Sequence, residues 1–339
     1  MTTERRALIL SGGGGRGAYH CGVLEYLEIV GWRPDILVGT SIGAINAAAI
    51  ASGRDALELQ SLWRGLTTDG VQRIRTDLFD LGNWTYLLDN SPWRQSLIQA
   101  NWFDFDRINS DAAPTLAVTA TDVYTGRLTV FSNRMLEPSK SQGPRSKVVQ
   151  HVSLTLDHIL ASCSIPIVYP WTRIAEGGGP YWDGAVVSNT PLGTALRAGA
   201  TDIIVVLLSP WEDGDGAGPY TEESDPKLWS LPGLALDWAL LASFRSDLRL
   251  CNVMNNFVAA FQLLDQGQRQ QLALELWPDD LPDARSARLG QLDEWHLVRP
   301  PRIVSPKKLL AVEQIITYDP AVHEQMFELG RSDAARILR

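Results

Sequence analysis

The sequence predicts an α/β protein whose central sheet is mainly parallel and covered by helices on both faces. Short apolar runs at 7–10, 35–38 and 202–208 read as buried strands, and helical patterns alternate with them over the first two thirds of the chain. Such alternation is typical of parallel sheets, because a crossover helix has to carry the chain back before each new strand begins. Two of the strand-to-helix junctions are rich in glycine.

Each expected element has its own signal in the sequence. Period-two alternation on both sides of a turn at 122–126 indicates a hairpin. We expect the polar segment 137–150 to be mobile, and 177–180 to form a turn. In chain order we expect a strand at 7–10, helix 18–30, strand 35–38, helix 42–52, a largely helical insert over 55–108, hairpin strands at 114–121 and 127–131, helix 154–163, helix 190–199 and strand 202–208.

The last third of the chain shows helices and no motif that indicates chemistry. A polar, glycine-rich break at 214–225 precedes one or two amphipathic helices over 228–274, and a terminal helix is expected at 320–338. The insert 60–108 and the helices at 228–264 could each form a lid over a binding groove or part of the core. Oligomeric state is not indicated.

Composition restricts the classes of function. The 339 residues carry a formal net charge of −9, which argues against a nucleic-acid-binding protein. Cys21, Cys163 and Cys251 lie far apart without a paired spacing, so free thiols are expected rather than disulfides or a zinc site. An N-terminal apolar run too short for a signal peptide, and the lack of any 18-residue apolar run, favour a cytoplasmic protein without a transmembrane helix.

Tryptophan is abundant, with 12 residues. Core packing explains most such residues, and a membrane-facing rim is the alternative for some of them. The rim candidates are Trp84, Trp93, Trp102, Trp229 and Trp238.

The most informative motif is Gly-x-Ser-x-Gly at 39–43, between the strand at 35–38 and the helix at 42–52. Many acyl hydrolases hold a nucleophilic serine on such a tight turn, with the flanking glycines tolerating the crowded backbone. Ser41 is therefore a candidate nucleophile flanked by Gly39 and Gly43. A purely structural turn remains the alternative for this segment alone.

A glycine loop at 12–17 follows the first strand, and it has two interpretations. Its Gly-x-Gly-x-x-Gly spacing matches a dinucleotide fingerprint, but the acidic residue expected about 20 positions later, Asp35, stands at the wrong end of its strand. The second interpretation is an oxyanion hole, in which backbone N–H groups converge on the site of the developing charge. The candidate residues of this loop are Gly12, Gly13, Gly14, Gly15, Arg16 and Gly17, with Gly13 and Gly14 as the foremost donors and Arg16 bracing the loop.

A serine nucleophile needs a base. His296 or His323 could close a triad in the chain order of α/β-hydrolases, but both stand in contexts that look like helix surface. Asp183 follows a turn and precedes Gly184, a residue that allows another backbone to approach. A structural Asp-Gly turn is the alternative.

Three motifs in this order, Gly-Gly-Gly-x-Arg-Gly at 12–17, Gly-x-Ser-x-Gly at 39–43 and Asp-Gly-Ala at 183–185, resemble the patatin-like phospholipases. The resemblance extends over about 7–208 and includes the runs at 120–126, 161–166 and 189–191. It implies a three-layer α/β/α patatin-like fold with a helical C-terminal extension. We expect one catalytic domain over 5–339, with the motif-bearing core at 5–210 and a mostly helical part at 225–339.

The resemblance also implies the chemistry. Ser41 would be the nucleophile and Asp183 the base of a dyad without histidine, the loop at 12–17 the oxyanion hole, and Gly184 and Ala185 the rest of the Asp-Gly-Ala motif. The expected activity is hydrolysis of lipid or other acyl esters through an acyl-serine intermediate, with no cofactor or metal and with transient contact to a membrane surface. A non-catalytic lipid-binding protein on the same scaffold and a dinucleotide-dependent enzyme are the rival functions.

Overall fold

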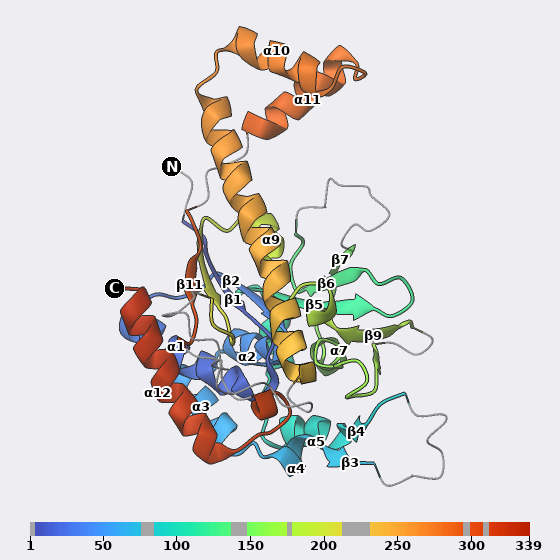
Figure 1. Cartoon of the computed structure of the whole chain (residues 1–339), viewed down its shortest axis with the longest axis vertical. Helices are drawn as coiled ribbons and strands as arrows, with labels where there is room; N and C mark the ends of the chain where they lie inside the picture. Colours follow the sequence, from blue (N-terminus) through green and yellow to red (C-terminus); the bar gives the residue numbers. More distant parts are fainter. Residues whose placement is uncertain are drawn as a thin grey trace.

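The computed structural model describes residues 4–75, 85–136, 148–174, 178–211, 231–293, 299–307 and 312–339. Among these residues, nine strands form one sheet whose main path runs β11-β10-β1-β2-β5-β6-β7 (Figure 1). Strands β8 and β9 extend the sheet beside β5. The strands are β1 (Arg6–Leu10), β2 (Ile36–Thr40), β5 (Thr115–Asp122), β6 (Leu128–Ser132), β7 (Val148–His151), β8 (Thr172–Arg173), β9 (Pro180–Asp183), β10 (Asp202–Val206) and β11 (Arg302–Val304).

Most of the sheet is parallel. Strands β11, β10, β1, β2 and β5 all run in one direction, and the hairpin partner β6 runs against β5. Strand β9 is also antiparallel to β5. The carboxyl ends of the parallel strands therefore meet at one edge, where loops after β1 and β2 lie next to each other.

Helices cover both faces of the sheet, and the alternating side chains of each strand decide which helices they contact. Leu8, Leu10 and Leu37 belong to a core that includes residues of α1 (Ala18–Ile29), α2 (Ile42–Ala51), α3 (Ala56–Arg64), α7 (Leu156–Ala161) and α12 (Pro320–Ile337). Ile9 and Val38 point to the other face, under α8 (Leu192–Arg197) and α9 (Leu231–Gln262). The result is the predicted three-layer α/β/α arrangement.

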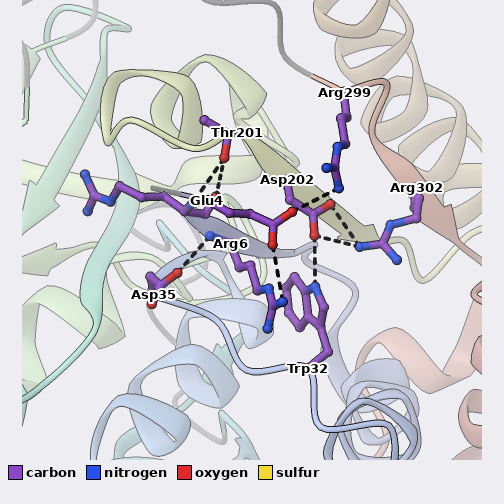
Figure 2. A network of polar contacts seen from close by, with 9 residues as sticks. Glu4, Arg6, Trp32, Asp35, Thr201, Asp202, Arg299 and Arg302 are labelled. Atoms are coloured by element: carbon purple, nitrogen blue, oxygen red, sulfur yellow. Dashed lines mark hydrogen bonds and ion pairs between the residues drawn. The ribbon is translucent and has the colours of Figure 1, made fainter. Parts of the chain in front are cut away.

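The C-terminal part contributes to the body and also projects from it. In Figure 1, α9 crosses the sheet and continues away from the body, where it carries α10 (Gln266–Leu276) and α11 (Pro282–Asp293). The chain then returns to add β11 to the sheet edge and α12 to the side of α1. At this edge, Arg302 and the indole N–H of Trp32 both bond the buried Asp202 carboxylate (Figure 2).

Described parts of the insert between α2 and β5 contribute side chains to the core. It contains α3, α4 (Thr68–Val71), the short strands β3 (Arg73–Ile74) and β4 (Leu88–Asp89), α5 (Ser91–Gln99) and α6 (Phe105–Asn109). Trp93 and Trp102 are 2% and 1% exposed, so core packing holds for both, whereas Trp238 is 53% exposed. Trp84 and Trp229 lie outside the described residues.

The predicted strands and helices of the core are present to within a few residues, and the differences are informative. Residues 148–150 belong to strand β7, which corrects the expected mobile segment 137–150, and 137–147 lie outside the described residues. The expected break at 214–225 also lies outside them. Strands β8, β9 and β11 are not predicted from the sequence, because they are two to four residues long and leave no periodic pattern. In the part of the chain that the structure describes, no helix is long and apolar enough to span a membrane.

Candidate active site

Ser41 stands on a strained turn between β2 and α2. Its φ of +55° is rare for a residue other than glycine. Its amide donates to the hydroxyl oxygen of Ser162, 2.8 Å away, which holds the turn in place. A Cβ on Gly43 would collide with the carbonyl oxygen of Leu10, and one on Gly39 would stand 2.5 Å from the carbonyl oxygen of Gly43. Both glycines are therefore required by close backbone packing, as the motif predicted.

The register of β5 brings Ser41 and Asp183 together from 142 positions apart. Thr40, at the end of β2, pairs with Thr119 of β5, and Asp183, at the end of β9, pairs with the next residue, Ala120. Strand β6 occupies the other side of β5 at Ala120. Strands β2 and β9 therefore pair with the same side of β5, one after the other and in opposite directions. Their carboxyl ends meet at Ser41 and Asp183.

Asp183 is buried, with 3% of its surface exposed. Its pKa is raised from 3.8 to about 7, mainly because burial disfavours the charged carboxylate. Hydrogen bonds from the Ser41 hydroxyl and the Ala185 amide act in the opposite direction, and the amide nitrogen lies 2.8 Å from Oδ1. Gly184 fits against Thr119, where a Cβ would collide with the threonine side chain. The carboxyl group is thus about as basic as a histidine, whose ordinary pKa is about 6.5.

The glycine loop lies beside this pair. The Gly12 amide donates to Oδ1 of Asn189, 2.7 Å away. In the described part of the chain, the amides of Gly13 and Gly14 donate to no protein acceptor, and the Arg16 amide donates to the Gly13 carbonyl at 3.3 Å. Among the described residues, the amides of Gly13 and Gly14, which the sequence predicts as the foremost donors, are therefore not engaged by the protein, while the Gly12 amide is already bonded.

A segment from the C-terminal part covers this loop. We call residues 312–318 the C-terminal strap. Its Ile315 and Thr317 carbonyls approach so closely that a Cβ on Gly14 or Gly15 would collide with them. Tyr318 is held to Thr68, whose hydroxyl accepts from the Tyr318 amide at 2.9 Å. The strap therefore packs directly on the backbone of Gly14 and Gly15, and these positions admit no side chain.

The histidines that the structure describes do not join the pair. His323 is 1% exposed rather than on a helix surface, and its Nδ1 lies 2.9 Å from the Trp63 carbonyl oxygen. His20 is buried beside Asn46, with 3.1 Å between Nδ1 and Nδ2. Among the described histidines none hydrogen-bonds Ser41 or Asp183, and His296 lies outside the described residues.

No sequence motif indicates a role in the site for two of its polar side chains, Ser162 and Asn189. Both lie in runs that resemble the family, but only the structure shows that one bonds the amide of Ser41 and the other the amide of Gly12. No described cluster of histidine, cysteine, aspartate or glutamate could hold a metal ion.

The fold and the site together define a three-layer α/β protein with a strained serine elbow, a buried carboxyl partner and a glycine loop. The sequence profile of one family, the patatin-like phospholipases, matches residues 8–196. The chain belongs to this family.

Two relatives and one solved structure are similar to the chain. A cGAMP-activated phospholipase of Pseudomonas aeruginosa is 32% identical over 54% of this chain and 53% of its own length. A cUMP-AMP-activated phospholipase of Escherichia coli is 25% identical over 84% of this chain and 88% of its own length. The chain therefore spans about half the length of the first relative and most of the second. The crystal structure of VipD from Legionella pneumophila aligns with 99% of this chain and 67% of the VipD chain, at 13% identity and a TM-score of 0.44.

Proposed function

We propose that this protein hydrolyses acyl esters of lipids, with Ser41 as the nucleophile and Asp183 as the base. The proposal rests mainly on one observation. Ser41, on its strained turn, hydrogen-bonds a buried carboxyl group whose pKa is raised to about 7. Membership of a phospholipase family supports a lipid ester as the substrate.

In the proposed reaction, the Ser41 hydroxyl oxygen attacks the ester carbonyl carbon while its proton passes to the Asp183 carboxylate. The carbonyl oxygen becomes negatively charged and is stabilised by the Gly13 and Gly14 amides, each donor contributing about 3–4 kcal/mol in comparable sites. Collapse of the intermediate releases the alcohol, which takes the proton from Asp183. Water then attacks the acyl-Ser41 ester and loses a proton to Asp183. The fatty acid leaves as the Ser41 oxygen takes that proton back, which restores the serine hydroxyl and the carboxylate.

The direct test combines a fluorophosphonate probe with an ester assay. We expect wild-type protein to be labelled at Ser41, as mapped on the labelled peptide, and the Ser41→Ala and Asp183→Asn variants to lose ester turnover. Folded His296→Ala and His323→Ala variants should keep their turnover. Binding of lipid without labelling would favour the non-catalytic rival, and a folded but inactive histidine variant would replace the dyad with a triad.

We further propose transient contact with a membrane through apolar side chains near the site. Segments around Asp183 expose such side chains: Val186 follows the Asp-Gly-Ala motif and is 53% exposed, and Ile167 is 70% exposed in the loop that leads to β8. The Leu87 amide donates to the Ile167 carbonyl at 2.8 Å, so the exposed Leu87 adjoins it. Ile167→Asp should weaken sedimentation with phospholipid vesicles. Ile29→Asp is the matched control, because Ile29 is 69% exposed at the C-terminal end of α1, where the chain has returned to the opposite edge of the sheet.

The names of the two relatives raise a question of regulation. Both are described as activated by a cyclic dinucleotide, and in this chain Ser41 is only 5% exposed. We propose that a cyclic dinucleotide increases the hydrolysis rate here too. Turnover of phospholipid vesicles is measured with cGAMP, with cUMP-AMP and with NAD as the control compound. Equal turnover under all conditions would contradict this proposal without affecting the proposed hydrolysis.

A further inference from the structure

The side chain of Asn189 joins the glycine loop to the serine elbow. It is 5% exposed and comes from the segment between the Asp-Gly-Ala motif and α8. Its Oδ1 accepts the Gly12 amide at 2.7 Å across 177 positions of sequence. A Cβ on Gly12 would lie 2.8 Å from both this oxygen and the Cβ of Ser41. Asn189, the loop and the candidate nucleophile thus converge on one point.

The backbone conformation at Gly12 determines how the rest of the glycine loop is oriented. The preceding residue, Ser11, is fixed to the sheet, because its amide donates to the Val206 carbonyl at 3.1 Å. From Gly13 onward the chain leaves the sheet, and Gly13 and Gly14 have φ values of +155° and +59°. Glycine allows these backbone angles, but its lack of a side chain does little to hold the backbone in them. Two side-chain contacts hold Gly12 between these parts: Oδ1 of Asn189 accepts its amide, and the Ser11 hydroxyl donates to its carbonyl oxygen at 3.3 Å. Of the two, the Asn189 bond is the one that comes from a distant segment of the chain.

We propose that Asn189 is a positioning residue for the oxyanion loop: by accepting the Gly12 amide, it sets the direction in which the Gly13 and Gly14 amides are presented to the substrate. This inference rests on the proposed function. Without the acceptor, the buried Gly12 amide would be left unsatisfied or would turn toward another partner, and the two following amides would move with it. Displacements of about 1 Å in such a site cost on the order of 100-fold in rate.

The chemistry of the amide explains why asparagine suits this position. A carboxylate would accept the same hydrogen bond, but its charge would lie close to Ser41 and hence to Asp183. Like charges raise the pKa of a carboxyl group and oppose the developing oxyanion. A neutral acceptor orients the loop without either effect.

The test uses two variants of Asn189 and one control. We expect Asn189→Ala to lower kcat for a soluble ester by about 10- to 100-fold with KM changed by less than threefold, and to slow fluorophosphonate labelling in parallel. Asn189→Asp keeps the acceptor and adds a charge, so we expect the acidic limb of its kcat/KM profile to move to higher pH, a shift that Asn189→Ala should not show.

Asn133→Ala is the matched control. Asn133 is also a buried asparagine that accepts a backbone amide, that of Leu116 at 2.8 Å, but this contact lies at the opposite end of β5. The control should lower the melting temperature and leave kcat of the folded protein unchanged. A kcat of Asn189→Ala within twofold of wild type, or an unmoved acidic limb in Asn189→Asp, would overturn the proposal. If wild-type protein hydrolyses no ester and resists labelling, the proposed function fails instead.

Discussion

At the scale of single residues, burial gives Asp183 its basicity. An ordinary aspartate is too weak a base to activate a serine, since its pKa of about 3.9 lies well below that of histidine. Desolvation raises the pKa of Asp183 to about 7, and the hydrogen bonds from Ser41 and Ala185 only partly oppose it. The carboxylate therefore becomes a useful base near neutral pH because it is kept from water.

The same burial predicts how stability depends on pH. Because the pKa of Asp183 is raised from 3.8 to about 7 in the folded state, the folded protein binds this proton more tightly than the unfolded chain. The contribution of Asp183 to stability is thus fully present below about pH 4 and is lost as the pH rises to about 7. The full loss is roughly 4 kcal/mol.

Asp183→Asn removes this titration. We expect the variant to gain stability relative to wild type as the pH rises from 4 to 8, with urea unfolding as the measurement. Ser41→Ala is the control: it keeps the carboxyl group but removes a hydrogen bond that lowers its pKa, so the pH dependence should remain and extend to slightly higher pH. Parallel stability profiles for wild type and Asp183→Asn would show that the pKa of Asp183 is not raised.

The pH dependence of activity follows from the same group. As the proposed base, Asp183 can accept a proton only when it is ionised, so kcat/KM for a neutral soluble ester should rise with pH and level off above an apparent pKa near 7. A rate already constant between pH 5 and 8 would contradict the assignment of Asp183 as the base.

At the scale of elements, the close crossing of α1 and α12 depends on two glycines. A Cβ on Gly330 of α12 would collide with the Tyr19 carbonyl of α1, and one on Gly22 of α1 would collide with the Phe327 carbonyl of α12. The helices approach so closely that backbone contacts backbone. Without the structure, both residues read as unfavourable glycines inside helices.

Gly330→Ala should therefore destabilise the protein by about 1–3 kcal/mol, because the helices must separate to admit a methyl group. Gly290→Ala is the matched control: this glycine also lies inside a helix, α11, but is exposed with nothing within 4 Å of an added Cβ. The control should stabilise the protein by up to about 1 kcal/mol. Thermal or urea unfolding measures both, and equal effects would contradict the described packing.

At the scale of the whole molecule, the C-terminal part completes the body formed by the N-terminal motifs. Strand β11 adds to the sheet beside β10, the C-terminal strap covers the glycine loop, and α12 packs on α1. Figure 2 shows the polar contacts that join β11 and the residue Arg299 before it to β10 and to the N-terminal segment, at the sheet edge opposite Ser41. Within them, the Arg302 guanidinium lies 2.9 Å from both carboxylate oxygens of Asp202.

Two arginines of this network should differ in their effect on stability. The Asp202 side chain is 8% exposed, so Arg302→Ala leaves a buried carboxylate with fewer partners and should cost about 1–3 kcal/mol. Arg299 pairs with Glu4, which is 41% exposed, so Arg299→Ala should change stability by less than about 1 kcal/mol. Urea unfolding of the two variants tests this difference, and equal losses would contradict it.

The sequence by itself determined the local features: the core strands and helices, the glycines of the serine elbow, and three motifs specific enough to identify the family. These features depend on residues that are close together in the sequence, so sequence patterns alone predict them. Even the terminal helix, predicted at 320–338, is found at Pro320–Ile337.

Only the tertiary structure decided how these features meet. Strand β9 is four residues long and has no pattern of its own, yet its place at the end of β2 along β5 brings Asp183 to Ser41. The acceptor for Gly12, the strap over Gly14 and the burial that raises the pKa of Asp183 likewise come from residues far along the chain. Burial and close backbone packing are properties of the assembled layers, and for that reason local sequence patterns do not contain them.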